Sequence, residues 1–366
     1  MINSQELFKL FIKNKINFFS GVPDSILKDF LNILELKKKL TNITCVNEGS
    51  AVSLAIGNYL GTKKVGLVYM QNSGLGNAIN PLISIAEKTV YSIPLILLIG
   101  WRGSPNSKDE PQHIAKGKIT RPLLDRLDIK HIIPNNKNDF LKITSLINYS
   151  KKNKKPVAIL IKNKILKKEN LNIKKDLNNS IMRSTFIHEL LKSLNKKDRI
   201  VSTTGYTSRE LNQIREINNI KNSKDFYMVG GMGHAAGVAL GHSINNRSRV
   251  ICLDGDGSML MHLGSLATVA NYGGKNYKYI MLNNNSHESV GGYKTHCNKI
   301  NIKDFSKSIG FKDYFHIDKK SNLNKKIKIF LKSKGPSFLE VIIKNKSMNN
   351  LKRPKNLKKI ISNFIK

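Results

Sequence analysis

Short apolar runs alternate with amphipathic stretches along most of the chain, and this alternation constrains the fold more than any other feature. In the first half, the apolar runs predict strands at residues 18–22, 43–46, 65–70, 93–99 and 156–161. The stretches between them predict helices at residues 25–36, 50–60 and 76–87. Repeated strand–helix alternation is typical of a parallel sheet covered by helices on both faces.

The same pattern returns after a polar, Asn-rich stretch. It predicts strands at residues 200–203, 249–253, 279–282 and 338–343, and helices at 184–194, 234–243 and 259–272. The 366 residues are enough for two domains of roughly 150 residues each. We therefore predict an α/β fold of two domains, residues 1–165 and 181–366, each a mostly parallel sheet flanked by helices and joined by a linker at 166–180.

The charge of the chain is strongly positive, with 62 Lys and Arg against 25 Asp and Glu. An excess of this kind is found in nucleic-acid-binding proteins, which is one alternative for the function. The lysines are spread along the whole chain, however, and the basic tail at 351–366 comes with no recognition motif and no series of stacking aromatic residues. We expect no nucleic-acid partner.

Three cysteines without a C-x-x-C pair exclude a disulfide scaffold and make a thiolate zinc site improbable. The apolar patch at residues 7–12 is interrupted by Lys9, which does not favour a signal peptide. No segment approaches the ~18 uncharged apolar residues of a membrane span. We expect a cytoplasmic protein in a reduced compartment, without a membrane partner.

Residues 250–258, VICLDGDGS, carry the most informative motif. An apolar strand ends in a glycine turn, and a helix begins at once. Gly255 and Gly257 allow a ligand close to the backbone, and the N–H groups of the helix that begins before Ser258 can bind a phosphate. Asp256 between them could hold a divalent cation beside that phosphate. Gly-Asp-Gly is also a common turn, so the motif needs support from elsewhere in the chain.

Asn284 supplies that support because it follows the next predicted strand, one helix and one strand after Asp256. Adjacent parallel strands would bring the two residues side by side. Their oxygens, with a nearby carbonyl that we assign to Ser286, make a hard-oxygen set suited to Mg²⁺.

The Gly255–Ser258 turn followed by Asn283 and Asn284 resembles the diphosphate-binding motif of thiamine-diphosphate enzymes. Further blocks narrow the resemblance to the phosphonopyruvate decarboxylase family of 2-keto-acid decarboxylases: GVPDS at 21–25, NEG at 47–49, YMQNSGLGN at 69–77, WRG at 101–103, KDEPQH at 108–113, TTGYTSRE at 203–210, GGMGH at 230–234 and HESVGG at 287–292. They span roughly residues 18 to 345 in the family's order. Asn285-Ser286 and Tyr293-Lys294 depart from the usual pattern.

The resemblance implies thiamine diphosphate and Mg²⁺ as cofactors. It implies that Glu48 hydrogen-bonds the aminopyrimidine ring, although an acid at a helix start is otherwise a simple helix cap. It implies that Met232 wedges between the two rings of the cofactor and that the Gly230 carbonyl accepts from the 4′-amino group. Thr207 would touch the diphosphate.

The implied reaction is the decarboxylation of 3-phosphonopyruvate to phosphonoacetaldehyde and CO₂, in phosphonate biosynthesis. The cations Arg102 and Lys108 are candidates to bind the small anionic 2-keto acid. Asp24 and His113 resemble residues that handle protons in related enzymes. Ser25 and His287 complete the candidate substrate set.

In this family the diphosphate-binding domain of one chain faces the pyrimidine-binding domain of another, so the resemblance implies a homodimer or higher homo-oligomer with its sites at the interface. Residues 1–165 would be the pyrimidine-binding domain and 181–366 the diphosphate- and Mg²⁺-binding domain. The similar sulfopyruvate decarboxylases share several blocks, which leaves sulfopyruvate as an alternative substrate. A thiamine-fold protein without catalysis would not be expected to keep Glu48, Asp256 and Asn284 together.

Overall fold

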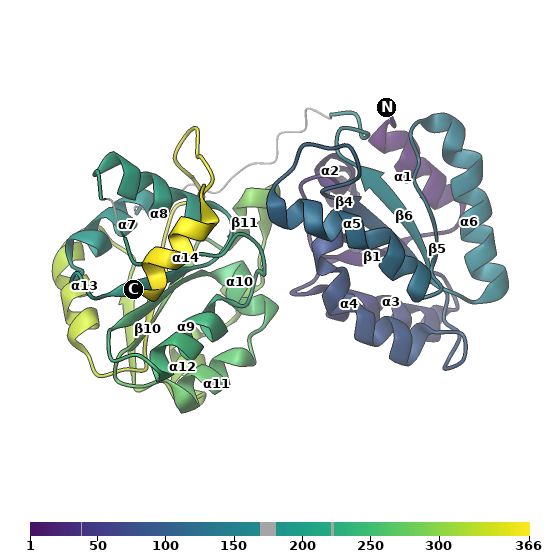
Figure 1. The fold of residues 1–366 in the computed structure, drawn as a ribbon. Coiled ribbons are helices and arrows are strands. Elements are labelled where there is room, and N and C mark those ends of the chain that lie inside the picture. Colours follow the sequence, from purple (N-terminus) through teal and green to yellow (C-terminus); the bar gives the residue numbers. More distant parts are fainter. Residues whose placement is uncertain (38, 169–180, 221–222) are drawn as a thin grey trace. The chain divides into compact units, whose positions relative to one another are not determined.

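The computed structural model describes residues 1–37, 39–168, 181–220 and 223–366, and the chain divides into two compact units, Met1–Lys174 and Lys175–Lys366 (Figure 1). Within the described residues, each unit holds a six-stranded sheet whose strand pairs are all parallel. The predicted α/β class with two parallel sheets is therefore confirmed. The predicted domain boundaries stay a prediction, and the predicted linker falls mostly at 169–180, outside the described residues.

The sheet of unit 1 is built from short strands whose central members are buried on both faces. In sheet order these are β2 (Thr41–Thr44), β1 (Phe18–Gly21), β3 (Leu67–Gln71), β4 (Ile96–Trp101), β6 (Val157–Lys162) and β5 (Lys130–Ile132). The α-helices are α1 (Ser4–Lys13), α2 (Lys28–Leu36), α3 (Glu48–Thr62), α4 (Leu75–Pro81), α5 (Pro111–Arg126) and α6 (Phe140–Asn153), with short helical turns η1 (Asn72–Gly74), η2 (Leu82–Ala86) and η3 (Lys137–Asp139). Strand β4 is buried throughout, as its continuous apolar run requires.

Two helices of unit 1 differ from their predicted extents. The helix expected from residue 25 starts at Lys28, because the Asp24 carboxylate accepts the backbone N–H groups of Ile26 and Leu27 and holds a turn there. The helix expected over 76–87 is α4, which ends at Pro81 and continues as the π-helical turn η2. The edge strand β5 was not predicted, and it is short and partly exposed.

Unit 2 has the same layered arrangement. Its sheet order is β13 (Asp313–Ile317), β14 (Ser337–Ile342), β10 (Tyr277–Asn283), β9 (Val250–Gly255), β7 (Arg199–Ser202) and β8 (Asp225–Tyr227). The α-helices are α7 (Arg183–Lys192), α8 (Tyr206–Ile217), α9 (Ala235–Ile244), α10 (Asp256–Met261), α11 (Ser265–Tyr272), α12 (Ile302–Ser308), α13 (Leu323–Lys332) and α14 (Leu357–Ile365). A small antiparallel pair, β11 (Ser286–His287) with β12 (Tyr293–Lys294), is flanked by the turns η4 (Glu288–Val290) and η5 (Cys297–Lys299).

The prediction of a single helix over 259–272 is wrong, because the chain forms two helices there, α10 and α11. α10 ends before His262, whose φ of −135° and ψ of 53° are not helical, and α11 begins at Ser265. The edge strands β8 and β13 were not predicted. β8 has only three residues, and the five residues of β13 include the polar Asp313 and His316, which interrupt its apolar pattern.

The basic C-terminal segment forms α14, which packs on the sheet mainly through one aromatic residue. Phe364 is buried, with its ring centroid 5.5 Å from that of Phe226 and 4.8 Å from that of His242. Its lysines Lys358 and Lys359 are exposed. Of the helices in the described ranges, none has the length and apolar character needed to cross a membrane.

In each sheet, the first strand along the chain has the next strand on one side and the strand after that on its other side. In unit 1, β1 lies between β2 and β3, and in unit 2, β7 lies between β8 and β9. Loops leaving the carboxyl ends of strands at such a point open a crevice, which is where ligands bind in sheets of this type. The candidate residues after β1, β3, β7 and β9 are therefore well placed.

Candidate functional site

Glu48 is a buried carboxylate at the start of α3. The helix cap is supplied by the preceding residue, because Asn47 Oδ1 accepts the Ser50 N–H at 2.8 Å. The Glu48 side chain is thus available for another role, and its Oε2 accepts from Asn77 Nδ2 at 2.8 Å. Glu48 is 5% exposed, and burial raises its pKa.

The space around this carboxylate is shaped by a glycine and a lysine. A Cβ on Gly74 would lie 1.9 Å from Glu48 Oε1, so any other residue there would displace the Glu48 carboxylate. Lys116, half-buried on α5, has its pKa lowered by burial and raised by the nearby charge of Glu48. The positive charge of Lys116 in turn opposes the effect of burial on the Glu48 pKa. Sequence analysis did not identify Lys116.

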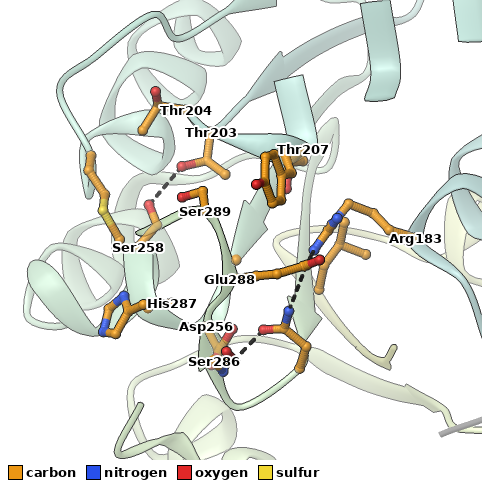
Figure 2. Close-up of a pocket in the computed structure, with 16 residues that line it drawn as sticks. Arg183, Thr203, Thr204, Thr207, Asp256, Ser258, Ser286, His287, Glu288 and Ser289 are labelled. Carbon is orange, nitrogen blue, oxygen red and sulfur yellow. Dashed lines mark hydrogen bonds and ion pairs between the residues drawn. The ribbon is translucent and has the colours of Figure 1, made fainter. Parts of the chain in front are cut away.

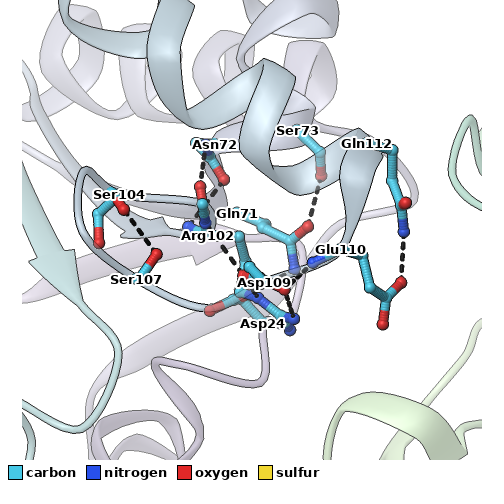
Figure 3. Close-up of polar contacts among 11 residues, drawn as sticks. Asp24, Gln71, Asn72, Ser73, Arg102, Ser104, Ser107, Asp109, Glu110 and Gln112 are labelled. Carbon is cyan, nitrogen blue, oxygen red and sulfur yellow. Dashed lines mark hydrogen bonds and ion pairs between the residues drawn. The ribbon is translucent and has the colours of Figure 1, made fainter.

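Asp24 lies at the switch point of unit 1, between the ends of β1 and β3 (Figure 3). It is fully buried, and its Oδ2 accepts from Ile26 N at 2.7 Å and Leu27 N at 3.1 Å. Its Oδ1 accepts from Gln71 Nε2 at 2.7 Å. A Cβ on Gly100 would meet Asp24 Oδ2 at 2.2 Å. Burial raises the pKa of Asp24 despite these hydrogen bonds, which favours proton transfer as its role.

Arg102 follows β4 and forms a two-pronged ion pair that the sequence did not reveal (Figure 3). Its Nε donates to Asp109 Oδ2 at 2.8 Å and its Nη2 to Asp109 Oδ1 at 2.6 Å. Asn72 holds the Arg102 backbone from both sides, accepting its N–H at 3.1 Å and donating to its carbonyl at 3.0 Å. The guanidinium is therefore rigidly placed, with part of its charge balanced by Asp109.

The other candidates of unit 1 occupy different settings. His113 is half-buried near the start of α5, and the charge of His113 acts on Asp109. The positive charge of Arg102 opposes the rise of the Asp24 pKa, so Arg102 and Asp24 are close enough to interact electrostatically. Ser25 and Lys108 have exposed side chains.

In unit 2, β9 and β10 are parallel neighbours with Gly255 opposite Leu282, as the spacing of Asp256 and Asn284 predicted. Asp256 is 2% exposed and opens α10. Its Oδ2 accepts from Thr295 Oγ1 at 2.5 Å. Burial raises its pKa to about 6, opposed by hydrogen bonds that include the Asn284 N–H.

The loop after β10 places several oxygens beside this carboxylate. Asn284 Oδ1 accepts from Ser286 N at 3.1 Å, and Asn284 Nδ2 donates to Glu288 Oε2 at 3.3 Å. Within the part of the chain that the structure describes, the buried Asn285 Oδ1 and Ser286 Oγ have no hydrogen-bond partner. Ser286 lines the same pocket as Asp256, and an unpartnered buried oxygen near a carboxylate matches the ligand chemistry of a hard divalent cation.

A pocket opens over these residues (Figure 2). It is lined by Arg183, Thr203, Thr204, Tyr206, Thr207, Met232, Gly255, Asp256, Gly257, Ser258, Leu282, Asn284, Ser286, His287, Glu288 and Ser289. The candidates Thr207, Met232, Gly255, Gly257, Ser258 and His287 are therefore brought together with the proposed metal ligands. Gly230 lies two residues from Met232 in the same loop.

The floor of the pocket is tightly built. A Cβ on Gly257 would meet His287 Cε1 at 2.7 Å, so a larger residue there would displace the His287 ring. Ser258 Oγ accepts from Thr203 Oγ1 at 2.8 Å and from Gly233 N at 3.0 Å, so this hydroxyl ties the ends of β7 and β9 to the Met232 loop. Burial lowers the pKa of His287 to about 4, which leaves its ring neutral at pH 7.

Sequence reasoning missed Arg183, Glu210, Thr295 and the role of Glu288. Arg183 is 4% exposed, and its Nη1 donates to Glu210 Oε1 at 3.0 Å and its Nη2 to Glu288 Oε2 at 2.6 Å. Glu288 stood inside the recognised block at 287–292, which was a usable signal. Arg183 belongs to no motif, and only the packing of α7 against α8 brings it to the pocket.

Comparison with known proteins agrees with this geometry. The N-terminal TPP binding domain of thiamine pyrophosphate enzymes matches residues 3–126, and the C-terminal TPP binding domain matches residues 203–341. A phosphonopyruvate decarboxylase of Streptomyces viridochromogenes is 32% identical over 92% of this chain and 87% of its own length. One of Streptomyces hygroscopicus is 30% identical over 97% and 91%. A sulfopyruvate decarboxylase of Methanosarcina acetivorans is 24% identical over 95% and 93%.

Proposed function

Because this chain belongs to the thiamine pyrophosphate enzymes, in the family of the phosphonopyruvate decarboxylases, we propose that it converts 3-phosphonopyruvate to phosphonoacetaldehyde and CO₂ in phosphonate biosynthesis. The carboxylate leaves as CO₂ and a proton takes its place on the former keto carbon. When bound, thiamine diphosphate accepts the electrons of the broken carbon–carbon bond. The observation that carries the proposal is the pocket of unit 2 that Asp256, Asn284 and Ser286 line together, with the buried Ser286 Oγ unpartnered among the described residues.

The diphosphate and its metal would bind in the pocket of unit 2. Asp256, Asn284 and Ser286 supply the oxygens for Mg²⁺. The residues that would contact the diphosphate are Thr207, Gly255, Gly257 and Ser258, around the start of α10, where the Gly255 position supplies no side-chain cap. Gly257 fits this role because the backbone must pass close to both the ligand and His287.

Glu48 would act on the pyrimidine ring, holding or exchanging a proton at a ring nitrogen. Its burial and raised pKa suit that role, and the Asn77 amide fixes the direction of its carboxylate. Met232 would hold the two rings in a bent arrangement, and the Gly230 carbonyl would accept from the amino group. This is catalysis by orientation as much as by proton transfer.

Substrate binding would use the cations near the end of β4. Arg102 is positioned by Asn72 and Asp109 to meet an anionic group with its remaining nitrogen. Asp24 and His113 would move protons, while Ser25, Lys108 and His287 would line the substrate. The neutral ring of His287 would serve by hydrogen bonding rather than by charge.

We further propose a homodimer or higher homo-oligomer in which unit 1 of one chain and unit 2 of another form each site. Mixing Glu48→Gln chains with Asp256→Ala chains tests this directly, because an unfolded and refolded mixture would regain activity only if one site draws on two chains. No recovery in mixtures shown to contain mixed oligomers would overturn the arrangement.

The decisive test of the reaction is aldehyde formation from phosphonopyruvate, with and without thiamine diphosphate and Mg²⁺. Sulfopyruvate is the comparison substrate, since the Methanosarcina relative also matches over nearly the whole chain. A higher kcat/KM for sulfopyruvate would replace the substrate and keep the chemistry. No cofactor-dependent CO₂ release from either acid would refute the proposal. The three cysteines are free and buried, and we propose a cytoplasmic location for the reaction.

A further inference from the structure

Two buried glutamates hold the consecutive asparagines at the end of β10. Glu340 of β14 accepts from Asn283 Nδ2 through its Oε1 at 2.8 Å. Glu288 accepts from Asn284 Nδ2 through its Oε2 at 3.3 Å. Each carboxylate therefore orients one side-chain amide, but only the amide of Asn284 belongs to the proposed metal site.

Glu288 is itself held in place by a buried arginine. Arg183 Nη2 lies 2.6 Å from the same Glu288 oxygen, and Arg183 Nη1 lies 3.0 Å from Glu210 Oε1 (Figure 2 shows Arg183 and Glu288). The side chains of Arg183 and Glu288 are each 5% exposed, and that of Glu210 is 1% exposed. Moving Glu288 away would leave a buried guanidinium partly unpaired, which is costly.

The two ends of a side-chain amide differ in metal binding, because the oxygen can be a ligand and the NH₂ group cannot. An ionised carboxylate only accepts hydrogen bonds, so Glu288 selects the amide orientation with nitrogen toward itself. The oxygen of Asn284 then faces the other way, where it already accepts the Ser286 N–H. We propose that Glu288, held by Arg183, is a positioning residue that turns the Asn284 oxygen toward the divalent metal, an inference that rests on the proposed metal site.

The test is Glu288→Leu, which removes the carboxylate oxygen that accepts from both Asn284 Nδ2 and Arg183 Nη2. Without this acceptor, no group in that position selects the nitrogen end of the Asn284 amide. Calorimetric Mg²⁺ titration at a fixed thiamine diphosphate concentration should show affinity about tenfold weaker or more, the scale found for residues that orient metal ligands. Circular dichroism checks that the variant folds.

Glu340→Leu is the matched control, because it makes the same change beside Asn283, which is not a proposed ligand. It should weaken Mg²⁺ binding far less. Asn284→Asp gives a second control, since a carboxylate presents oxygen on both sides and needs no orientation. In that background Glu288→Leu should cost no Mg²⁺ affinity.

Equal losses in Glu288→Leu and Glu340→Leu, an unchanged affinity in Glu288→Leu, or the same loss in the Asn284→Asp background would overturn the positioning role. Asp256→Ala separates this from a failure of the metal site itself. If Asp256→Ala still binds thiamine diphosphate in a Mg²⁺-dependent way, the site is wrongly assigned. If it does not, and Glu288→Leu binds Mg²⁺ normally, only the role of Glu288 fails.

Discussion

Glu48 in unit 1 and Asp256 in unit 2 occupy the same local position, and comparing them shows how surroundings set chemistry. Each is the first residue of a helix that follows a strand of a parallel sheet. Each is almost fully buried, at 5% and 2% exposure, and burial raises both pKa values. Position and burial alone would predict similar roles.

Their neighbours differ. Glu48 faces an amide donor from Asn77, the bare backbone of Gly74 and the charge of Lys116. Asp256 lies in a loop system with unpartnered oxygens at Asn285 and Ser286. Both carboxylates accept hydrogen bonds, but only Asp256 shares its pocket with a buried hydroxyl oxygen, Ser286 Oγ, that has no partner among the described residues. Such an oxygen beside a carboxylate suits a cation. The comparison therefore supports the proposals of proton chemistry at Glu48 and metal binding at Asp256.

The largest expected effect is at Asp256. Asp256→Ala should abolish Mg²⁺-dependent binding of thiamine diphosphate, because the one carboxylate of the proposed oxygen set is lost. Calorimetry measures the binding, and circular dichroism of the variant checks that the fold is intact. Unchanged cofactor affinity would mean that Asp256 is not a metal ligand and that it does not differ from Glu48 in this respect.

Glu48→Gln should slow hydrogen exchange at C2 of the bound cofactor by on the order of 10²-fold, the lower range of general acid–base catalysis. Cofactor affinity should change much less, because the proposed diphosphate site lies in unit 2. The matched control is Asn47→Ala, which removes the helix cap and should cost ~1 kcal/mol of stability without slowing exchange. Normal exchange in Glu48→Gln would leave this residue with a structural role only.

Substitutions of the cationic residues near the end of β4 test whether unit 1 also determines substrate specificity. Arg102→Ala should reduce kcat/KM for phosphonopyruvate by on the order of 10²-fold, since it removes a charge-assisted contact of ~3 kcal/mol. Pyruvate, which lacks the phosphonate, should lose much less. Lys108→Ala should have a smaller effect, because its exposed charge is screened by solvent. Equal losses for both substrates in Arg102→Ala would mean that Arg102 only holds the loop around Asp109.

The smallest effect is expected at Lys116, which tunes Glu48. The Lys116 charge favours ionised Glu48, so Lys116→Met should raise the Glu48 pKa further. The acid limb of the pH profile for C2 exchange should then move to higher pH by about one unit or less, the size of a ~1 kcal/mol charge interaction. Lys118→Met, an exposed lysine on the same helix, is the control. A shift to lower pH, or none, would exclude this coupling.

Much of the fold could be predicted because strands buried on both faces must be continuously apolar. β4, residues 250–253 of β9 and residues 279–282 of β10 have this signature, and their order along the chain limits how they can pair. The edge strands β5 and β8 escaped prediction, since each has three residues and polar positions that local patterns assign to loops.

The candidate site was predictable where a functional side chain directly follows a strand. Asp256, Asn284 and Glu48 each follow a strand, so predicting the strands of the sheet was enough to place them. The pairing of Arg102 with Asp109 was not predictable, because it depends on how the loop before α5 folds back. Lys116 near Glu48 and Arg183 beside Glu288 depend on helix packing in the same way.

The sequence by itself determined which residues stand at the carboxyl ends of the strands, because the period and apolarity of each run decide where a strand stops. The tertiary structure alone decided which of those residues share a pocket and with what partners. Strand order placed Asp256 beside Asn284, and the packing of α7 brought Arg183 to Glu288 across 105 residues of chain. Such contacts arise from the burial of distant surfaces against one another, which no local window of sequence contains.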